Sequence, residues 1–131
     1  MKILHTIGYL GLAQGGPVES LRVIANRQAE LGHNVRIVST FKSGDGDSPV
    51  FNENIEIIKL DSFGPFRFVL EFEKIALSQN FIPDIIHVHG LWNYFCYGSY
   101  LIHKKKKVPI VTSLCGMLQA DALKISYQKK K

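Results

Sequence analysis

A glycine turn and a pair of histidines are the residues of this chain best suited to chemistry. Gly15 and Gly16 precede Pro17, and glycine lets backbone N–H groups approach a ligand closely. A helix that begins there presents unpaired N–H groups and the positive end of its dipole, which suits a phosphate. The spacing matches neither Gly-x-Gly-x-x-Gly nor a Walker loop, so a standard dinucleotide or ATP site is disfavoured. Phosphate binding and a plain tight turn remain the two interpretations.

The histidines lie in the segment His87-Val88-His89-Gly90. Residues two apart in a strand point to the same face, so the pair could ligate a metal. No nearby Cys, Asp or Glu completes an obvious site, and a metal is therefore disfavoured. We expect His87 to pack inside the sheet and His89 to face a cleft, where it can donate a hydrogen bond or move a proton near neutral pH. Gly90 leaves room for a ligand.

Aromatic, amide and thiol side chains follow two of the predicted strands. Trp92 and Asn93 come directly after the histidine segment. An aromatic ring beside an amide is a common surface for a sugar, with a Trp buried at a helix start as the alternative. Cys115 would be a nucleophile only if a base lowered its pKa, and the spacing supports no Cys–His arrangement. An unreactive thiol is therefore the default expectation.

The elements that position these residues alternate along the chain. Strands are expected at 2–8, 34–40, 55–60, 84–89 and 109–113, and helices at 17–31, 65–80, 92–106 and 119–129. The first helix should bury Val18, Leu21, Ile24, Ala25 and Leu31, and Gly32 should cap it. The alternation predicts an α/β fold, a Rossmann-like doubly wound parallel sheet with strand order 3-2-1-4-5. Ligands bind such sheets at the carboxyl ends of the strands. Three candidate loops fall there, at 9–16, 90–93 and 114–118.

Composition and charge narrow the class of protein. The 131 residues, of which 46% are hydrophobic, predict one globular domain over 1–131. The net charge of +5 is concentrated in lysine runs at 104–107 and 129–131. These runs are either solvated helix ends or a contact for anionic lipid or phosphate. No motif for nucleic acid accompanies them.

The expected compartment follows from cysteine usage and hydropathy. The two cysteines lie in different predicted segments, so no disulfide framework is indicated and a reducing cytoplasm is expected. No apolar run approaches the ~20 residues of a membrane span. Any membrane association should therefore be peripheral, on the inner face.

Four segments in order resemble the N-terminal domain of glycosyltransferase family 4, a large retaining family with GT-B architecture. They are 14–17 (Gln-Gly-Gly-Pro), 30–35 (Glu-Leu-Gly-His-Asn-Val), 84–92 (Asp-Ile-Ile-His-Val-His-Gly-Leu-Trp) and 108–113 (Val-Pro-Ile-Val-Thr-Ser). The resemblance covers essentially the whole chain. It implies the N-terminal half of a molecule with two Rossmann-like domains and an active site in the cleft between them.

The resemblance also implies an activity and roles for residues. Members of the family move a sugar from a nucleotide-sugar donor to the hydroxyl of a glycan or lipid-linked acceptor, as in polysaccharide biosynthesis. The glycine turn, Gly15 and Gly16, then approaches the donor diphosphate. The acceptor cleft takes Gln14, Gly90, Trp92, Asn93, Gly116 and Met117, and the catalytic candidates are His89 and Cys115. No metal or other cofactor is expected, because backbone N–H groups and basic side chains stabilise the departing diphosphate.

Two departures from the family pattern bear on activity. Cys115 stands where relatives usually carry the histidine of a Ser-Pro-His-Gly-Met segment, and a thiol is a weak donor. Losing a required transition-state hydrogen bond would slow transfer by on the order of 10²-fold. The family's C-terminal nucleotide-sugar domain is absent from the 131 residues, so we expect the chain alone to be inactive. It is interpreted as a truncated or split enzyme completed by a separate C-terminal domain. The alternative is a non-catalytic acceptor-binding module or an inactive remnant.

Overall fold

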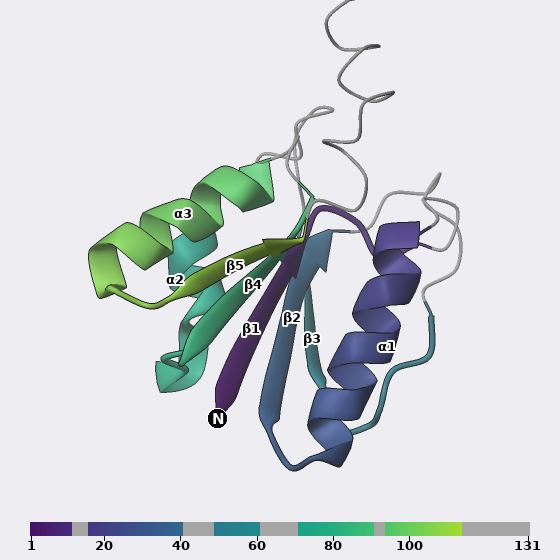
Figure 1. Cartoon of the computed structure of the whole chain (residues 1–131). Coiled ribbons are helices and arrows are strands. Elements are labelled where there is room, and N and C mark those ends of the chain that lie inside the picture. The colour runs from purple at the N-terminus through teal and green to yellow at the C-terminus, as the bar shows by residue number, and fades with distance from the viewer. Residues whose placement is uncertain (12–15, 41–48, 61–70, 91–93, 114–131) are drawn as a thin grey trace, which may run out of the picture.

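Five parallel strands form the centre of the protein in the computed structural model, which describes residues 1–11, 16–40, 49–60, 71–90 and 94–113. The described elements are β1 (Lys2–Ile7), α1 (Gly16–Glu30), β2 (Asn34–Thr40), β3 (Glu56–Leu60), α2 (Phe72–Ala76), η3 (Ser78–Asn80), β4 (Ile85–His89), α3 (Tyr94–Lys106) and β5 (Ile110–Ser113). The strand order is β3-β2-β1-β4-β5, with every neighbouring pair parallel. The predicted α/β fold and strand order are therefore confirmed (Figure 1).

Helix α1 covers one face of the sheet. Its buried residues Val18, Leu21 and Ala25 pack with Ile7 and Ile37 of the strands. Leu31, predicted to join this apolar face, is 60% exposed. The prediction was wrong because Leu31 follows the last helical residue and leaves the helical repeat.

A Schellman motif ends α1, as the predicted glycine cap requires. Gly32 has a φ of +91°, its N–H donates to the Ala29 carbonyl at 3.0 Å, and the His33 N–H donates to the Gln28 carbonyl at 3.1 Å. Glycine adopts this left-handed conformation without the Cβ strain that other residues incur. The turn sends the chain straight into β2.

Helices α2 and α3 cover the opposite face. Phe72, Phe95 and Ile102 pack against Leu4 and Val88 in one buried cluster. A buried hydrogen bond of 2.7 Å also joins the hydroxyls of Thr6 on β1 and Ser99 on α3. Because neighbouring residues of a strand point to opposite faces, the even-numbered positions of β1 and β4 contact these helices.

The region predicted as one helix over 65–80 is shorter and broken where it is described. Residues 65–70 lie outside the described ranges; after them α2 and η3 are separate, and Gln79 has a φ of +59°. The predicted helix over 119–129 also lies outside those ranges. None of the helices described is long and apolar enough to cross a membrane.

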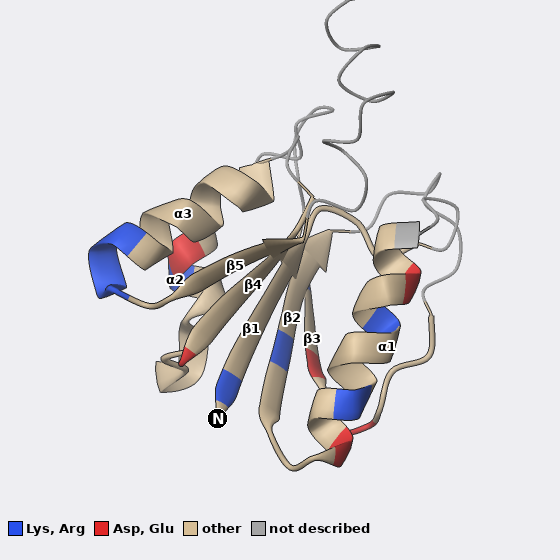
Figure 2. Cartoon of the chain, in the orientation of Figure 1, with Lys and Arg blue, Asp and Glu red and all other residues tan. Residues whose placement is uncertain are grey.

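Lysines gather at the far end of α3 from the strand carboxyl ends. The last turn of α3 carries His103 and Lys104–Lys106, and the run over 104–107 is exposed. Figure 2 shows this blue end of α3 separated from the charges of α1. Cations at a helix C-terminus also interact favourably with its dipole.

Candidate functional site

The carboxyl ends of β1, β4 and β5 lie at one edge of the sheet (Figure 1). After β1 the chain adds β2 and β3 on one side of it, and then returns to add β4 and β5 on the other side. Gly90 follows β4 with a φ of +93°, and its N–H donates to the Ser113 carbonyl at 3.0 Å. Helix α1 begins at this same edge with Gly16. The topological switch point, a common ligand site in such sheets, therefore lies beside His89 and Gly90.

Three histidines converge just below this edge. His5 of β1 pairs in register with His87 of β4, and Ile7 pairs with His89. All three side chains thus share one face of the sheet. The rings of His87 and His89 are stacked with centroids 4.1 Å apart, and the His5 ring lies 5.1 and 5.2 Å from them.

A chain of hydrogen bonds fixes the tautomers of two of these rings. The His5 Nε2 lies 2.6 Å from Gln28 Oε1, and the His5 Nδ1 lies 3.0 Å from His89 Nε2. An amide oxygen only accepts, so His5 carries its proton on Nε2 and accepts at Nδ1 from His89. The neutral His89 ring then has an unprotonated Nδ1, which is buried without a hydrogen-bond partner.

Burial keeps this cluster uncharged. It lowers the pKa of His5 from 6.5 to about 4, although the bond to Gln28 opposes the shift. Burial, followed by the neighbouring histidines, lowers the pKa of His89 to about 2. Burial also lowers the pKa of His87. At neutral pH all three are neutral imidazoles. Each therefore has one unprotonated ring nitrogen, whose lone pair can accept a hydrogen bond or a proton, or bind a cation.

The exposure of the two strand-β4 histidines is the reverse of the expected one. His89 is 2% exposed, whereas His87 is partly exposed. The physical reason is their neighbours, because His89 lies against His5 beneath α1. His87 pairs in register with Val111 of β5, which is 46% exposed.

The predicted site residues are only partly within the described ranges. His89 and Gly90 lie at the strand carboxyl edge, and Gly16 is the first residue of α1. The remaining candidates lie outside the described residues: Gln14, Gly15, Trp92, Asn93, Cys115, Gly116 and Met117.

Sequence reasoning missed His5, Gln28 and Ser113 as partners of the histidine pair. His87 Nε2 lies 2.5 Å from the Ser113 hydroxyl oxygen. A signal was present, because in a 3-2-1-4-5 sheet the first and fourth strands are neighbours, and the first carries His5 while the fourth carries His87 and His89. The segment around His87 and His89 offers no obvious Cys, Asp or Glu as a third ligand, whereas the parallel sheet supplies His5, which lies 82 residues before His87.

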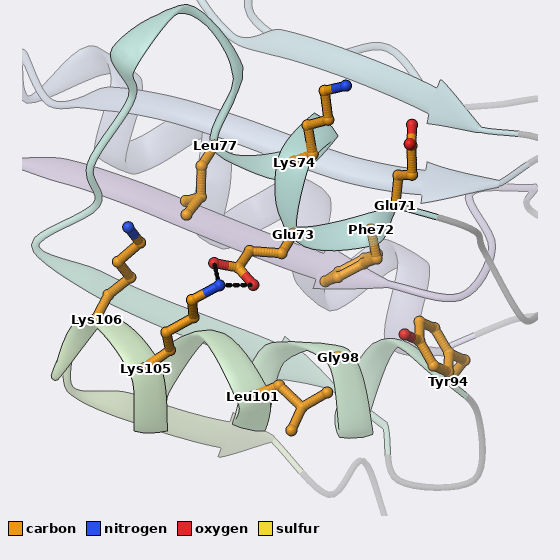
Figure 3. A pocket seen from close by; sticks show the side chains of 10 residues that line it. All are labelled: Glu71, Phe72, Glu73, Lys74, Leu77, Tyr94, Gly98, Leu101, Lys105 and Lys106. Atoms are coloured by element: carbon orange, nitrogen blue, oxygen red, sulfur yellow. Dashed lines mark hydrogen bonds and ion pairs between the residues drawn. The ribbon is translucent and has the colours of Figure 1, made fainter.

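A second concave feature lies between α2 and α3, on the opposite face of the sheet from the histidines. This α2–α3 groove has a volume of about 530 Å³. Its lining mixes both signs of charge, and Lys105 pairs with Glu73 at 3.4 Å (Figure 3). Gly98 faces Phe72 so closely that an added Cβ would lie 2.7 Å from the ring. None of the predicted site residues lines it.

Comparison with known proteins identifies a family. The model of a family described as glycosyl transferase 4-like matches residues 16–129. This stretch includes α1, strand β4 with its two histidines, and strand β5. No curated protein matches the chain.

Proposed function

Since the chain belongs to the glycosyl transferase 4-like family, we propose that it is the acceptor-side domain of a retaining glycosyltransferase. In this proposal it serves transfer from a nucleotide sugar to the hydroxyl of a glycan or lipid-linked acceptor. The observation that supports it best is the junction of β1, β4 and β5 at the carboxyl edge of the sheet. His89, Gly90 and the Ser113 backbone lie together there.

Helix α1 supplies the second line of support, through its position and polarity. It runs over Gly16–Glu30 and starts at the carboxyl edge (Figure 1). The N-terminus of a helix of this length presents unpaired N–H groups and a partial positive charge to an anion. We infer that Gly15 and Gly16 approach the diphosphate of the donor, whose negative charge grows as the sugar departs. This role needs no metal.

The acceptor side of the proposal rests on the loops that follow β4 and β5. Gly90 keeps the backbone beside His89 free of a side chain, so a sugar ring can approach closely. We place Gln14, Trp92, Asn93, Gly116 and Met117 around that ring. Cys115 occupies the position of the family histidine, and its thiol is a weaker donor than imidazole. Transfer by the wild-type sequence is therefore proposed to be slow.

The proposed function is tested by supplying a C-terminal nucleotide-sugar domain of the same family, fused or in trans. Transfer of labelled sugar is measured with the chain alone, with the second domain alone and with both. The proposal predicts transfer only with both. Cys115→His should raise the rate on the order of 10²-fold, whereas Cys96→Ala, which changes the other cysteine, should leave it unchanged.

Two results would overturn parts of this proposal. Turnover of a nucleotide sugar by the chain alone would contradict the need for a second domain. Acceptor binding without transfer in any combination would instead favour a non-catalytic binding module.

Peripheral contact with an anionic membrane is proposed from the lysine run at 104–107. These lysines are exposed, and they lie at and just beyond the end of α3 (Figure 2). Each cation near an anionic surface contributes roughly 1 kcal/mol at most, and salt screens it. Changing all four lysines to glutamine should abolish sedimentation with phosphatidylserine vesicles. The control, Arg22→Gln with Arg27→Gln on α1, should sediment as the wild type does. Binding that is absent or insensitive to salt would contradict this role.

A further inference from the structure

We propose that His5, His87 and His89 form a binding site for one divalent cation of the zinc class. The three residues come from two neighbouring strands, and the ring nitrogens available as ligands all lie within 4.8 Å of one another. Histidine nitrogen is a preferred ligand of Zn²⁺, Co²⁺, Ni²⁺ and Cu²⁺. This site lies on the face of the sheet that α1 covers. Its occupancy by a cation does not depend on sugar transfer.

The dimensions of the cluster suit a small cation after modest ring rotation. Tetrahedral Zn–N bonds of about 2.0–2.1 Å place two ligand nitrogens about 3.3 Å apart. The His5 Nδ1 and His89 Nε2 already lie 3.0 Å apart. The ligand atoms lie at most 4.8 Å apart, so the widest separation would have to shorten by about 1.5 Å on binding.

Hydrogen bonds to one nitrogen of His5 and one nitrogen of His87 already orient these two rings as metal binding through the other nitrogen requires. A metal-bound histidine almost always donates its other N–H to an oxygen. The His5 Nε2 donates to Gln28 Oε1 at 2.6 Å, which leaves Nδ1 directed at His89. The His87 Nε2 makes a hydrogen bond of 2.5 Å with the Ser113 hydroxyl, which leaves its Nδ1 for a cation.

The electrostatic state of the cluster also favours a cation. Ligation requires neutral imidazole, and burial already lowers the pKa of each of the three rings. No net release of a proton is needed at neutral pH, but the proton that His89 Nε2 donates to His5 must move to His89 Nδ1 before Nε2 can bind a cation. His87 is partly exposed beside Val111 of β5, which is 46% exposed, so a cation can enter from that side of the sheet.

The test is titration of the untagged chain with cobalt(II) alone, followed by absorption spectroscopy, and with zinc(II) alone, followed by calorimetry. The expected result is one tight equivalent of metal, with a cobalt spectrum typical of tetrahedral nitrogen ligation and without a thiolate band. His87→Ala should weaken binding on the order of 100-fold or more. His33→Ala changes a histidine outside the cluster and should have no effect.

Gln28→Ala keeps all three ligands and removes only the oxygen behind His5, so it should weaken binding roughly 10–100-fold even if His87→Ala folds poorly. The site would be refuted if the wild type shows no saturable binding. Equal weakening by His33→Ala, or a thiolate band, would refute it as well.

Discussion

Replacing Arg36 with alanine should destabilise the fold strongly, because this guanidinium joins β2 to the chain beyond α2. The side chain is 3% exposed. Its Nη1 donates to the carbonyls of Ala76 at 3.0 Å and Ser78 at 2.8 Å, and its Nε donates to Glu56. The guanidinium carbon also lies 4.3 Å from the centre of the Phe81 ring. One side chain thus satisfies backbone groups that α2 and η3 leave open.

The magnitude follows from what the substitution leaves behind. Each buried carbonyl that loses its donor costs about 1–3 kcal/mol, and the Ser78 carbonyl, partly buried, should lie near the lower figure. The contact with Phe81 adds about 0.5–2 kcal/mol. The Glu56 side chain is 46% exposed, so it regains water and contributes little. Summing the two carbonyls and the ring contact, we expect the free energy of unfolding to fall by about 3–5 kcal/mol.

Urea unfolding at pH 7, followed by circular dichroism, measures this change by linear extrapolation. The matched control is Arg22→Ala, because Arg22 pairs with Glu19 on the exposed side of α1. A fully exposed pair of this kind contributes little to stability, because water and salt screen it. Arg36→Lys should recover part of the loss, since lysine keeps the charge but not the planar fork. The reasoning is refuted if Arg36→Ala costs no more than Arg22→Ala.

Three smaller changes test other parts of the structure. Gly98→Ala should lower stability by about 1–3 kcal/mol in thermal unfolding, because the new Cβ would lie 2.7 Å from Phe72; an unchanged melting temperature would contradict that packing. Gly32→Ala meets no atom within 4 Å, so its expected cost of about 1–2 kcal/mol is purely conformational, and Gly32→Asn should restore much of it. With a chelator present, the free energy of unfolding should be highest above pH 6.5 and fall toward pH 4. His5 and His89 have lowered pKa values in the fold, so in this range the unfolded chain binds protons that the folded chain does not. His5 alone accounts for about 2 kcal/mol at pH 5, and equal urea midpoints at pH 7 and pH 5 would count against it.

The topology could be predicted because each element carries its own local signal. β-Branched residues fill 34–40, and a glycine follows the first helix at the position its cap needs. Alternation of strands and helices then restricts the sheet to a few orders. One error falls at an element end, where Leu31 lies just past α1. Another falls within 71–80, where α2 and η3 are separate. Strand β5 begins after Pro109, which has no N–H, while the Pro109 carbonyl still accepts from Ile86.

The histidine cluster could be predicted only in part, since it depends on register between strands far apart in sequence. The pair His87 and His89 is visible from spacing alone. The third member, His5, is brought beside them by the pairing of β1 with β4, and Gln28 reaches it from α1. Burial of His89 beneath α1 is a tertiary effect as well, which is why its exposure was expected to be higher.

The acceptor-side proposal is tested most directly by an amide NMR titration of the chain with simple alkyl glycosides and with nucleotide sugars, each alone. The account predicts that a glycoside shifts the amide signals of His89, Gly90 and Ser113 at the carboxyl edge. The amide signals of Lys2 and Asp84 should not shift. These two residues are hydrogen-bonded to each other at the amino-terminal ends of β1 and β4, far from the carboxyl edge. Shifts confined to those opposite ends or to the α2–α3 groove, or no shift with any glycoside, would contradict it.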